Sequence, residues 1–187
     1  MPPALRLPAL ASALACLLLA GCAGGSLANA ALQMVGLAKP PPEVSDAQKP
    51  PRTIHLQLHA GQRLNTDAQG QSLALVARIY KLRQRAAFEQ APYDSFLDVQ
   101  KEKALLGPDL LEVKEVLLVP GQRLDLQEKV TREAGFIGVV ALFRAPAAQR
   151  WRATVAAQDA ENDGLTIGLH ACTISMAGTD STLPHCE

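Results

Sequence analysis

The sequence predicts a mainly β fold, an antiparallel β-sandwich of seven to eight strands with one short helical insertion. Short runs of alternating or continuous apolar residues recur along residues 53–187, and turn-forming residues separate them. The chain is 48% hydrophobic but only 4% aromatic, which indicates a core of aliphatic side chains. One helical pattern falls between the second and third predicted strands, so strands and helices do not alternate along the chain.

The first two predicted strands differ in burial. In Ile54–His59 apolar and polar residues alternate strictly, which predicts a half-buried strand with both histidines on the outer face. The run from Ser72 to Leu82 is apolar on nearly both faces and fits a central strand. Within this strand we expect the ring of Tyr80 in the core and Arg78 at a sheet edge or capping a loop.

A loop of about twelve residues, Ala60 to Gln71, separates these two strands. It contains Gly61, Asn65, Asp67 and Gly70, residue types that favour turns and left-handed backbone. The loop is longer than the two to five residues typical of a hairpin, and loops of such length are often functional. Asn65 and Asp67 can shape it through side-chain to backbone hydrogen bonds, a structural role that is compatible with contacting a partner.

The helical insertion is predicted in residues 85–106. Apolar residues lie among charged ones there and Pro92 interrupts the pattern, so we expect one or two short helices. Ser95 to Asp98 have the form of a capping box, and the helical run after them stops at Gly107-Pro108.

Further strands complete the predicted sandwich, with turn signals at Pro120-Gly121 and from Asp159 to Gly164. They are predicted at Leu111–Val119, Leu124–Glu128, Phe136–Phe143, Trp151–Ala157 and Leu165–Ser175. Alternation in the last of these places His170 and Cys172 on its outer face.

The first 21 residues read as a signal peptide that is removed. Arg6 is the only charge, and an apolar stretch too short to span a membrane follows it. The tetrapeptide Leu19-Ala20-Gly21-Cys22 resembles the lipobox of bacterial lipoproteins, which implies that Cys22 carries a covalent lipid. The alternative is an uncleaved anchor or an ordinary signal peptide with an unrelated cysteine. Because Ala23 rather than an aspartate follows, the resemblance implies an outer-membrane protein that faces the periplasm.

The rest of the chain divides into a tether and one domain. Residues 22–52 are rich in proline, which favours extended backbone, and we interpret them as a lipid-anchored tether. Residues 53–187 form the β-sandwich domain with a C-terminal tail. The whole chain carries 18 basic and 18 acidic residues, with no clustered basic face that would favour nucleic-acid binding.

Two cysteines remain once Cys16 is removed with the signal peptide and Cys22 is acylated. In the oxidising periplasm, Cys172 and Cys186 most simply form one disulfide. It would close a loop of about fourteen residues and contribute about 3 kcal/mol in the chain-entropy model.

An alternative function is binding of a metal or small ligand by a C-terminal cluster of His170, Cys172, His185 and Cys186, since imidazole and thiolate bind zinc. Oxidation to a disulfide would remove the thiolates, so we assign no metal site. The chain contains no nucleophile elbow, no zinc-protease helix motif and no glycine-rich phosphate loop. We therefore expect no catalytic residues, no enzyme activity and no cofactor besides the lipid.

The motifs in their order resemble the TssJ family, also called VasD or SciN, the outer-membrane lipoproteins of type VI secretion systems. The resemblance covers about residues 53 to 157. The residues that carry it, besides the lipobox and the tether, are Leu64, Asn65, Asp67, Gly70 and Ser72, then Val76-x-Arg78-Ile79-Tyr80-x-Leu82, Leu118-Val119-Pro120-Gly121, Gly138 to Arg144 and Trp151-Arg152.

Membership of this family implies a transthyretin-like or C2-like sandwich with a non-catalytic role. The role is to hold the periplasmic C-terminal region of the inner-membrane protein TssM at the outer membrane, in a complex that also contains TssL. In the family the loop between the first two strands contributes to that contact. The corresponding partner-binding residues of this sequence are Gly61, Gln62, Arg63, Leu64, Asn65, Thr66, Asp67 and Gly70.

Overall fold

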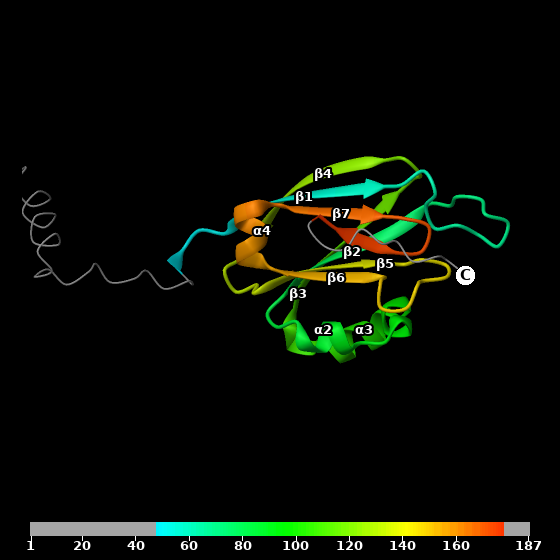
Figure 1. The fold of residues 1–187 in the computed structure, drawn as a ribbon. Helices are drawn as coiled ribbons and strands as arrows, with labels where there is room; N and C mark the ends of the chain where they lie inside the picture. Colours follow the sequence, from blue (N-terminus) through cyan, green and yellow to red (C-terminus); the bar gives the residue numbers. More distant parts are fainter. Residues whose placement is uncertain (1–47, 178–187) are drawn as a thin grey trace, which may run out of the picture. The chain divides into compact units, whose positions relative to one another are not determined.

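Two four-stranded sheets and a helical layer make up residues 48–177, the part of the chain that this computed structural model describes (Figure 1). In chain order the elements are β1 (Arg52–Ala60), β2 (Leu75–Leu82), α2 (Ala86–Gln90), the 3-10 segment η2 (Tyr93–Leu97), α3 (Val99–Leu106), the 3-10 segment η3 (Gly107–Asp109), β3 (Leu110–Leu118), β4 (Arg123–Val130), β5 (Phe136–Ala141), β6 (Arg152–Ala156), α4 (Ala157–Asp163), β7 (Leu165–Leu169) and β8 (Ile174–Met176).

The sandwich predicted from the sequence is confirmed. The first sheet has the strand order β4-β1-β7-β8 and the second has the order β3-β2-β5-β6. One pair departs from the antiparallel pattern: β1 and β7 are parallel, with Leu56 in register with Leu165. The chain passes from β6 in the second sheet through α4 to β7 in the first, so β7 starts at the same end as β1 and runs in the same direction.

The alternation in β1 places its apolar residues in the core as predicted, since Ile54, Leu56 and Leu58 are at most 1% exposed. β2 is buried on nearly both faces, but it starts at Leu75, three residues later than predicted. The preceding residues belong to the loop instead, where the Ser72 hydroxyl donates to the Gln62 carbonyl at 2.8 Å.

The segments α2, η2 and α3 cover the outer face of the second sheet (Figure 1). An aromatic cluster lies between them and the sheet. The ring of Tyr80 packs against Phe88 and Phe96 with centroids 5.2 and 5.8 Å away, so its predicted place in the core is confirmed. Gly138, opposite Tyr80 on β5, leaves room for the Phe88 ring, because a Cβ there would lie 2.7 Å from that ring.

Arg78 joins the second sheet to the helical layer. It lies on a central strand rather than at a sheet edge, and it donates to the carbonyl of Phe96 at 2.8 Å. Its guanidinium also pairs with Glu102 on α3 at 2.8 Å and with Glu115 on β3 at 2.9 Å. Burial raises the pKa of Glu102, and the charge of Arg78 opposes this rise.

The start of α3 corrects the predicted capping box. The cap is Asp98, whose carboxylate accepts hydrogen bonds from the backbone N–H groups of Gln100 and Lys101, while Ser95 lies inside η2. The predicted stop is confirmed, because Gly107 follows the last residue of α3 with a φ of 49°.

The turn predicted from Asp159 to Gly164 is wrong, because most of it belongs to α4. Ala157 and Ala160, three residues apart, are fully buried against the strands. Glu161 on the same helix pairs with Arg52 at the start of β1 at 3.3 Å. Packing and this ion pair stabilise a seven-residue helix whose polar composition favours a turn.

The single long strand predicted from Leu165 to Ser175 is also wrong. β7 ends at Leu169, the chain turns, and β8 returns along β7 with Ile174 in register with Leu169. Cys172 therefore does not lie on the outer face of a continuous strand; it lies in the turn and is 2% exposed.

Several predictions concern residues outside the described range 48–177: the signal peptide, the lipid site Cys22, most of the tether, and His185 and Cys186 of the tail. The disulfide between Cys172 and Cys186 accordingly stays a prediction. Within the described residues no helix is long and apolar enough to span a membrane.

Candidate functional site

Four connections gather at one end of the sandwich, which we call the loop end: residues 61–74, 119–122, 142–151 and 170–173. β1, β3, β5 and β7 all run toward this end, and β2, β4, β6 and β8 start from it. In Figure 1 the connection 61–74 projects at the right, whereas the start of β1 and α4 lie at the left.

The base of the 61–74 connection is attached to the turn after β7. The backbone N–H of Gly61 donates to the carbonyl of Leu169 at 2.8 Å. The N–H groups of Asn65 and Thr66 donate to the carbonyls of His170 and Ala171 at 3.2 and 3.1 Å. These bonds hold the loop close to the sandwich over its first six residues, so it leaves the strands in a defined direction.

Leu64 and Asn65 anchor the middle of the loop. Leu64 is fully buried in the core, and Asn65 is 7% exposed with a φ of 46°. The side-chain amide of Asn65 donates to the carbonyl of Ala74 at 2.9 Å, and its side-chain oxygen accepts from the N–H of Arg144 at 2.7 Å. Asn65 thereby joins both arms of the loop to the neighbouring 142–151 connection.

Asp67 shapes the tip of the loop. One carboxylate oxygen accepts from the backbone N–H groups of Gln69 and Gln71 at 2.9 and 2.8 Å. The N–H of Gly70 donates to the carbonyl of Asp67, and Gly70 has a φ of 76°, which favours glycine. The predicted structural roles of Asn65 and Asp67 are therefore confirmed.

The eight loop residues predicted as partner-binding fall into two groups. Leu64 and Asn65 are buried and hold the loop in shape. Gln62, Arg63 and Gly70 are exposed and available to a partner, while Gly61, Thr66 and Asp67 are partly exposed. Contact with a partner is untested for all eight.

The sequence prediction missed three apolar side chains near the loop, Leu73, Leu117 and Val119, which are exposed at 38%, 62% and 50%. Leu117 and Val119 occupy alternate positions, which places them on one face of a strand. The signal available in the sequence was an apolar residue at every outward position near the end of this strand.

His170 lies under the base of the loop. Its Nε2 is 2.9 Å from the hydroxyl of Ser175, and burial lowers its pKa, which favours a neutral ring. In residues 48–177 there is no group of three or more His, Cys, Asp or Glu side chains that could hold a metal ion. Two members of the predicted ligand cluster, His185 and Cys186, lie outside that range.

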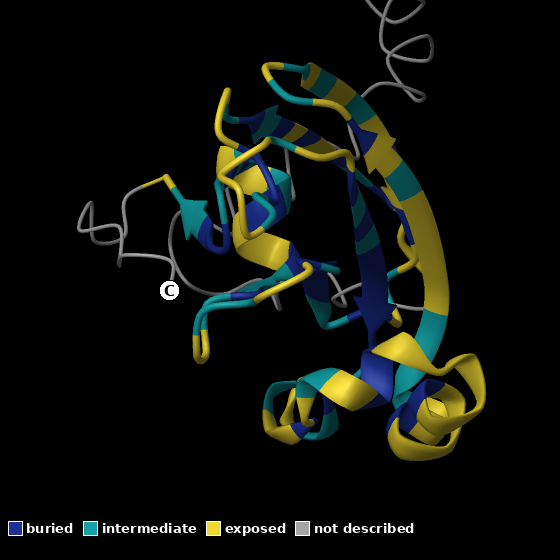
Figure 2. Cartoon of the chain, turned by 90° about the vertical axis from the view of Figure 1, so that its right-hand side faces the viewer, coloured by how far each residue is buried: buried dark blue, intermediate teal, exposed yellow. Residues whose placement is uncertain are grey.

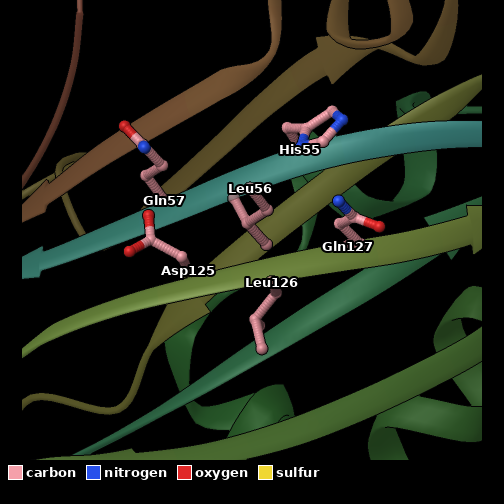
Figure 3. A pocket seen from close by; sticks show the side chains of 6 residues that line it. All are labelled: His55, Leu56, Gln57, Asp125, Leu126 and Gln127. Carbon is pink, nitrogen blue, oxygen red and sulfur yellow. The ribbon is translucent and has the colours of Figure 1, made fainter.

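A hollow elsewhere on the surface lies over the outer face of β1 and β4, away from the loop (Figure 3). His55 faces Gln127 and Gln57 faces Asp125 across the two strands. Leu56 and Leu126 also line the hollow. Its one imidazole, His55, and its one carboxylate, Asp125, belong to different cross-strand pairs. This arrangement brings together neither a nucleophile and a base nor a set of metal ligands.

A protein-family model described as "Type VI secretion lipoprotein, VasD, EvfM, TssJ" matches residues 52–172 of this chain. The match begins at β1 and ends in the turn before β8, so it includes all of the loop end except Thr173. No curated protein matches the chain closely enough to count as a relative.

Solved structures are similar as well. The lipoprotein TssJ1 from Pseudomonas aeruginosa is 30% identical, with 71% of this chain and 100% of that chain covered at a TM-score of 0.61. A chain in the structure titled "T6SS protein TssM C-terminal domain (869-1107) from EAEC" is 29% identical, with 68% and 99% covered at 0.59. A chain in a structure titled "Type VI membrane complex" is 29% identical, with 67% and 97% covered at 0.61.

Proposed function

Because the chain belongs to the type VI secretion lipoprotein family of VasD, EvfM and TssJ, we propose that it is a docking lipoprotein of the outer membrane. It is anchored through a lipid on Cys22, faces the periplasm and holds the periplasmic C-terminal region of TssM, in a complex that also contains TssL. The role is non-catalytic. The observation that carries the proposal is that the loop end lies opposite the end at which the tether enters the sandwich.

The separation of the two ends follows from β1. The tether joins the sandwich at Arg52, and the loop begins after Ala60. Nine residues of strand span about 30 Å at about 3.3 Å per residue. The loop end therefore lies about 30 Å from the point at which the tether joins the sandwich.

The loop is suited to recognition because its conformation is fixed before a partner binds. Its backbone is attached to residues 169–171, and the side chains of Asn65 and Asp67 satisfy groups in both of its arms. A loop that is ordered in the free protein loses less conformational entropy on binding than a flexible one. Arg63 and Gln62 are exposed on this rigid support.

The solved structures support TssM as the partner. The match to the TssM-titled structure spans about 127 residues of this chain and 99% of the matched chain, whereas the titled range contains 239 residues. These lengths favour a matched chain that is a lipoprotein-sized polypeptide present beside the TssM segment. A chain of the same fold also occurs in a type VI membrane complex.

The anchor is tested separately from the docking surface. Two or more acyl chains on Cys22 would hold the protein stably, since each buried methylene contributes about 0.8 kcal/mol. Cys22→Ser should move the protein from the membrane fraction to the soluble periplasmic fraction and leave the sandwich folded. An unchanged membrane fraction would contradict the lipid anchor.

Docking is tested by titrating the mature chain, in detergent, with the periplasmic region of TssM from the same host. We expect wild-type protein to bind and Arg63→Glu to weaken binding by tenfold or more. Lys103→Glu, an equal charge change at an exposed position on α3, is the matched control and should bind like the wild type. Failure of the wild type to bind would overturn the proposed function; unchanged affinity of Arg63→Glu would remove Arg63 from the contact.

A further inference from the structure

We propose that Leu117 and Val119 form an apolar docking patch, hereafter the apolar patch, that packs against an apolar face of the TssM periplasmic region. The inference rests on the proposed function and extends it from the loop to the adjoining face of the second sheet. The exposed loop residues would then form the polar part of the contact, and the patch its apolar centre.

The strand register places Leu117 and Val119 on one face. Leu75 pairs with Leu118, and both are fully buried, so these positions point into the core. Their neighbours therefore point outward: Leu117 and Val119 flank Leu118 on the outer face.

Leu117 and Val119 are more exposed than Val113, the apolar side chain at an outward position farther from the loop end, which is 42% exposed. Leu117 is 62% exposed and Val119 is 50% exposed. Farther from the loop, the helices cover the same face, and Arg78 joins Glu115 there to the helical layer. The helices cover this face only in part, and Leu117 and Val119 lie beyond them toward the loop end. Figure 2 looks onto the loop end. There β3 is the long curved strand, and most of its residues are exposed.

Large apolar side chains gathered on one exposed face commonly mark a surface that a partner covers. Leu117 and Val119 leave half or more of their surface in water, and covering this apolar surface in a contact is favourable. Neither patch residue is charged, so the surface that covers them should be apolar.

We assign TssM as the occupant because the patch continues the loop that is proposed to contact it. Val119 precedes the turn whose Gly121 N–H donates to the carbonyl of Gly61 at 3.1 Å, at the base of the loop. Gln62 packs over Gly121, where a Cβ would lie 2.6 Å from its amide nitrogen. A partner that contacts the exposed Gln62 is therefore already beside Val119, so loop and patch present one surface.

The test uses the double variant Leu117→Ser/Val119→Ser in the mature chain, titrated with the periplasmic region of TssM. We expect at least a tenfold loss of affinity with little change in melting temperature, because both side chains are exposed in the free protein. Val113→Ser is the matched control: Val113 is 42% exposed on the same face of the same strand but lies toward the helices, and its substitution should change affinity less than twofold.

The outcomes separate the patch from the proposed function. Wild-type binding with unchanged affinity of the double variant would overturn the apolar patch and leave the proposed function intact. Absence of wild-type binding would overturn both. Sedimentation of the chain alone tests a second copy as the occupant: a wild-type dimer that the double variant converts to a monomer would also overturn the assignment to TssM.

Discussion

Replacement of Asn65 should destabilise the protein more than replacement of any exposed loop residue. Asn65→Ala removes the bond to the Ala74 carbonyl at 2.9 Å and the bond from the Arg144 N–H at 2.7 Å. Because Ala74 and Arg144 are exposed, water can replace part of this bonding, so each lost bond should cost about 1 kcal/mol. Alanine at a φ of 46° adds about 1 kcal/mol, because a Cβ disfavours left-handed backbone.

The expected loss in the free energy of unfolding is therefore about 3 kcal/mol. Asn65→Gly separates the two contributions: glycine loses the same hydrogen bonds but tolerates the backbone, so it should cost about 2 kcal/mol. Urea unfolding, monitored by circular dichroism, measures both values under identical conditions. A loss below about 0.5 kcal/mol for Asn65→Ala would refute the claim that this side chain holds the loop to the sandwich.

Other substitutions test the helical layer. Gly138→Ala should cost about 1 to 3 kcal/mol in urea unfolding, because its Cβ would meet the Phe88 ring; unchanged stability would contradict that packing. Arg78→Ala should cost about 3 kcal/mol because it leaves Glu102 buried without its cation, and Arg78→Lys should recover part of the loss. Asp98→Ala should lower the melting temperature at pH 7, and Asp98→Asn, a neutral cap, should lower it less. Two backbone N–H groups lower the pKa of Asp98, so the difference between Asp98 and Ala should be largest above about pH 4 and should shrink as the pH falls further and the carboxylate is protonated. A difference that does not change with pH would contradict a cap by the ionised carboxylate.

Most of the sandwich could be predicted because its residues follow local rules. The alternation in β1 sets which face is buried, and the continuous apolar run in β2 sets its central place. Turn chemistry marks the tip of the 61–74 loop, where Asp67 and Gly70 adopt the bonding and backbone typical of their residue types. The order of these motifs also identified the family, which the family model confirms.

The sequence predictions were wrong where contacts between residues far apart in the sequence determine the local structure. α4 forms because Ala157 and Ala160 pack against strands and Glu161 meets Arg52, more than a hundred residues earlier. The parallel pairing of β1 with β7 depends on which end of the sandwich α4 occupies, and no residue type signals that. The start of α3 was predicted too early because Asp98, rather than Ser95, caps this helix.

The candidate site shows the same division. Residue types were sufficient to find the loop and its two shaping side chains, Asn65 and Asp67. They were insufficient to find the apolar patch, because Leu117 looks like any strand leucine until the helices are seen to stop short of it. Whether a strand leucine is exposed depends on how far the helices extend over the sheet, and this is known only from the folded structure.

The most direct test of the account is site-specific photo-crosslinking in the native host, which reports contact in the assembled complex. A photoreactive residue at Arg63, at the loop end, should yield an adduct with TssM. The same residue at Asn162, exposed on α4 at the opposite end, should yield none. An adduct from Asn162 together with none from Arg63, in cells where the complex is intact, would contradict docking through the loop end.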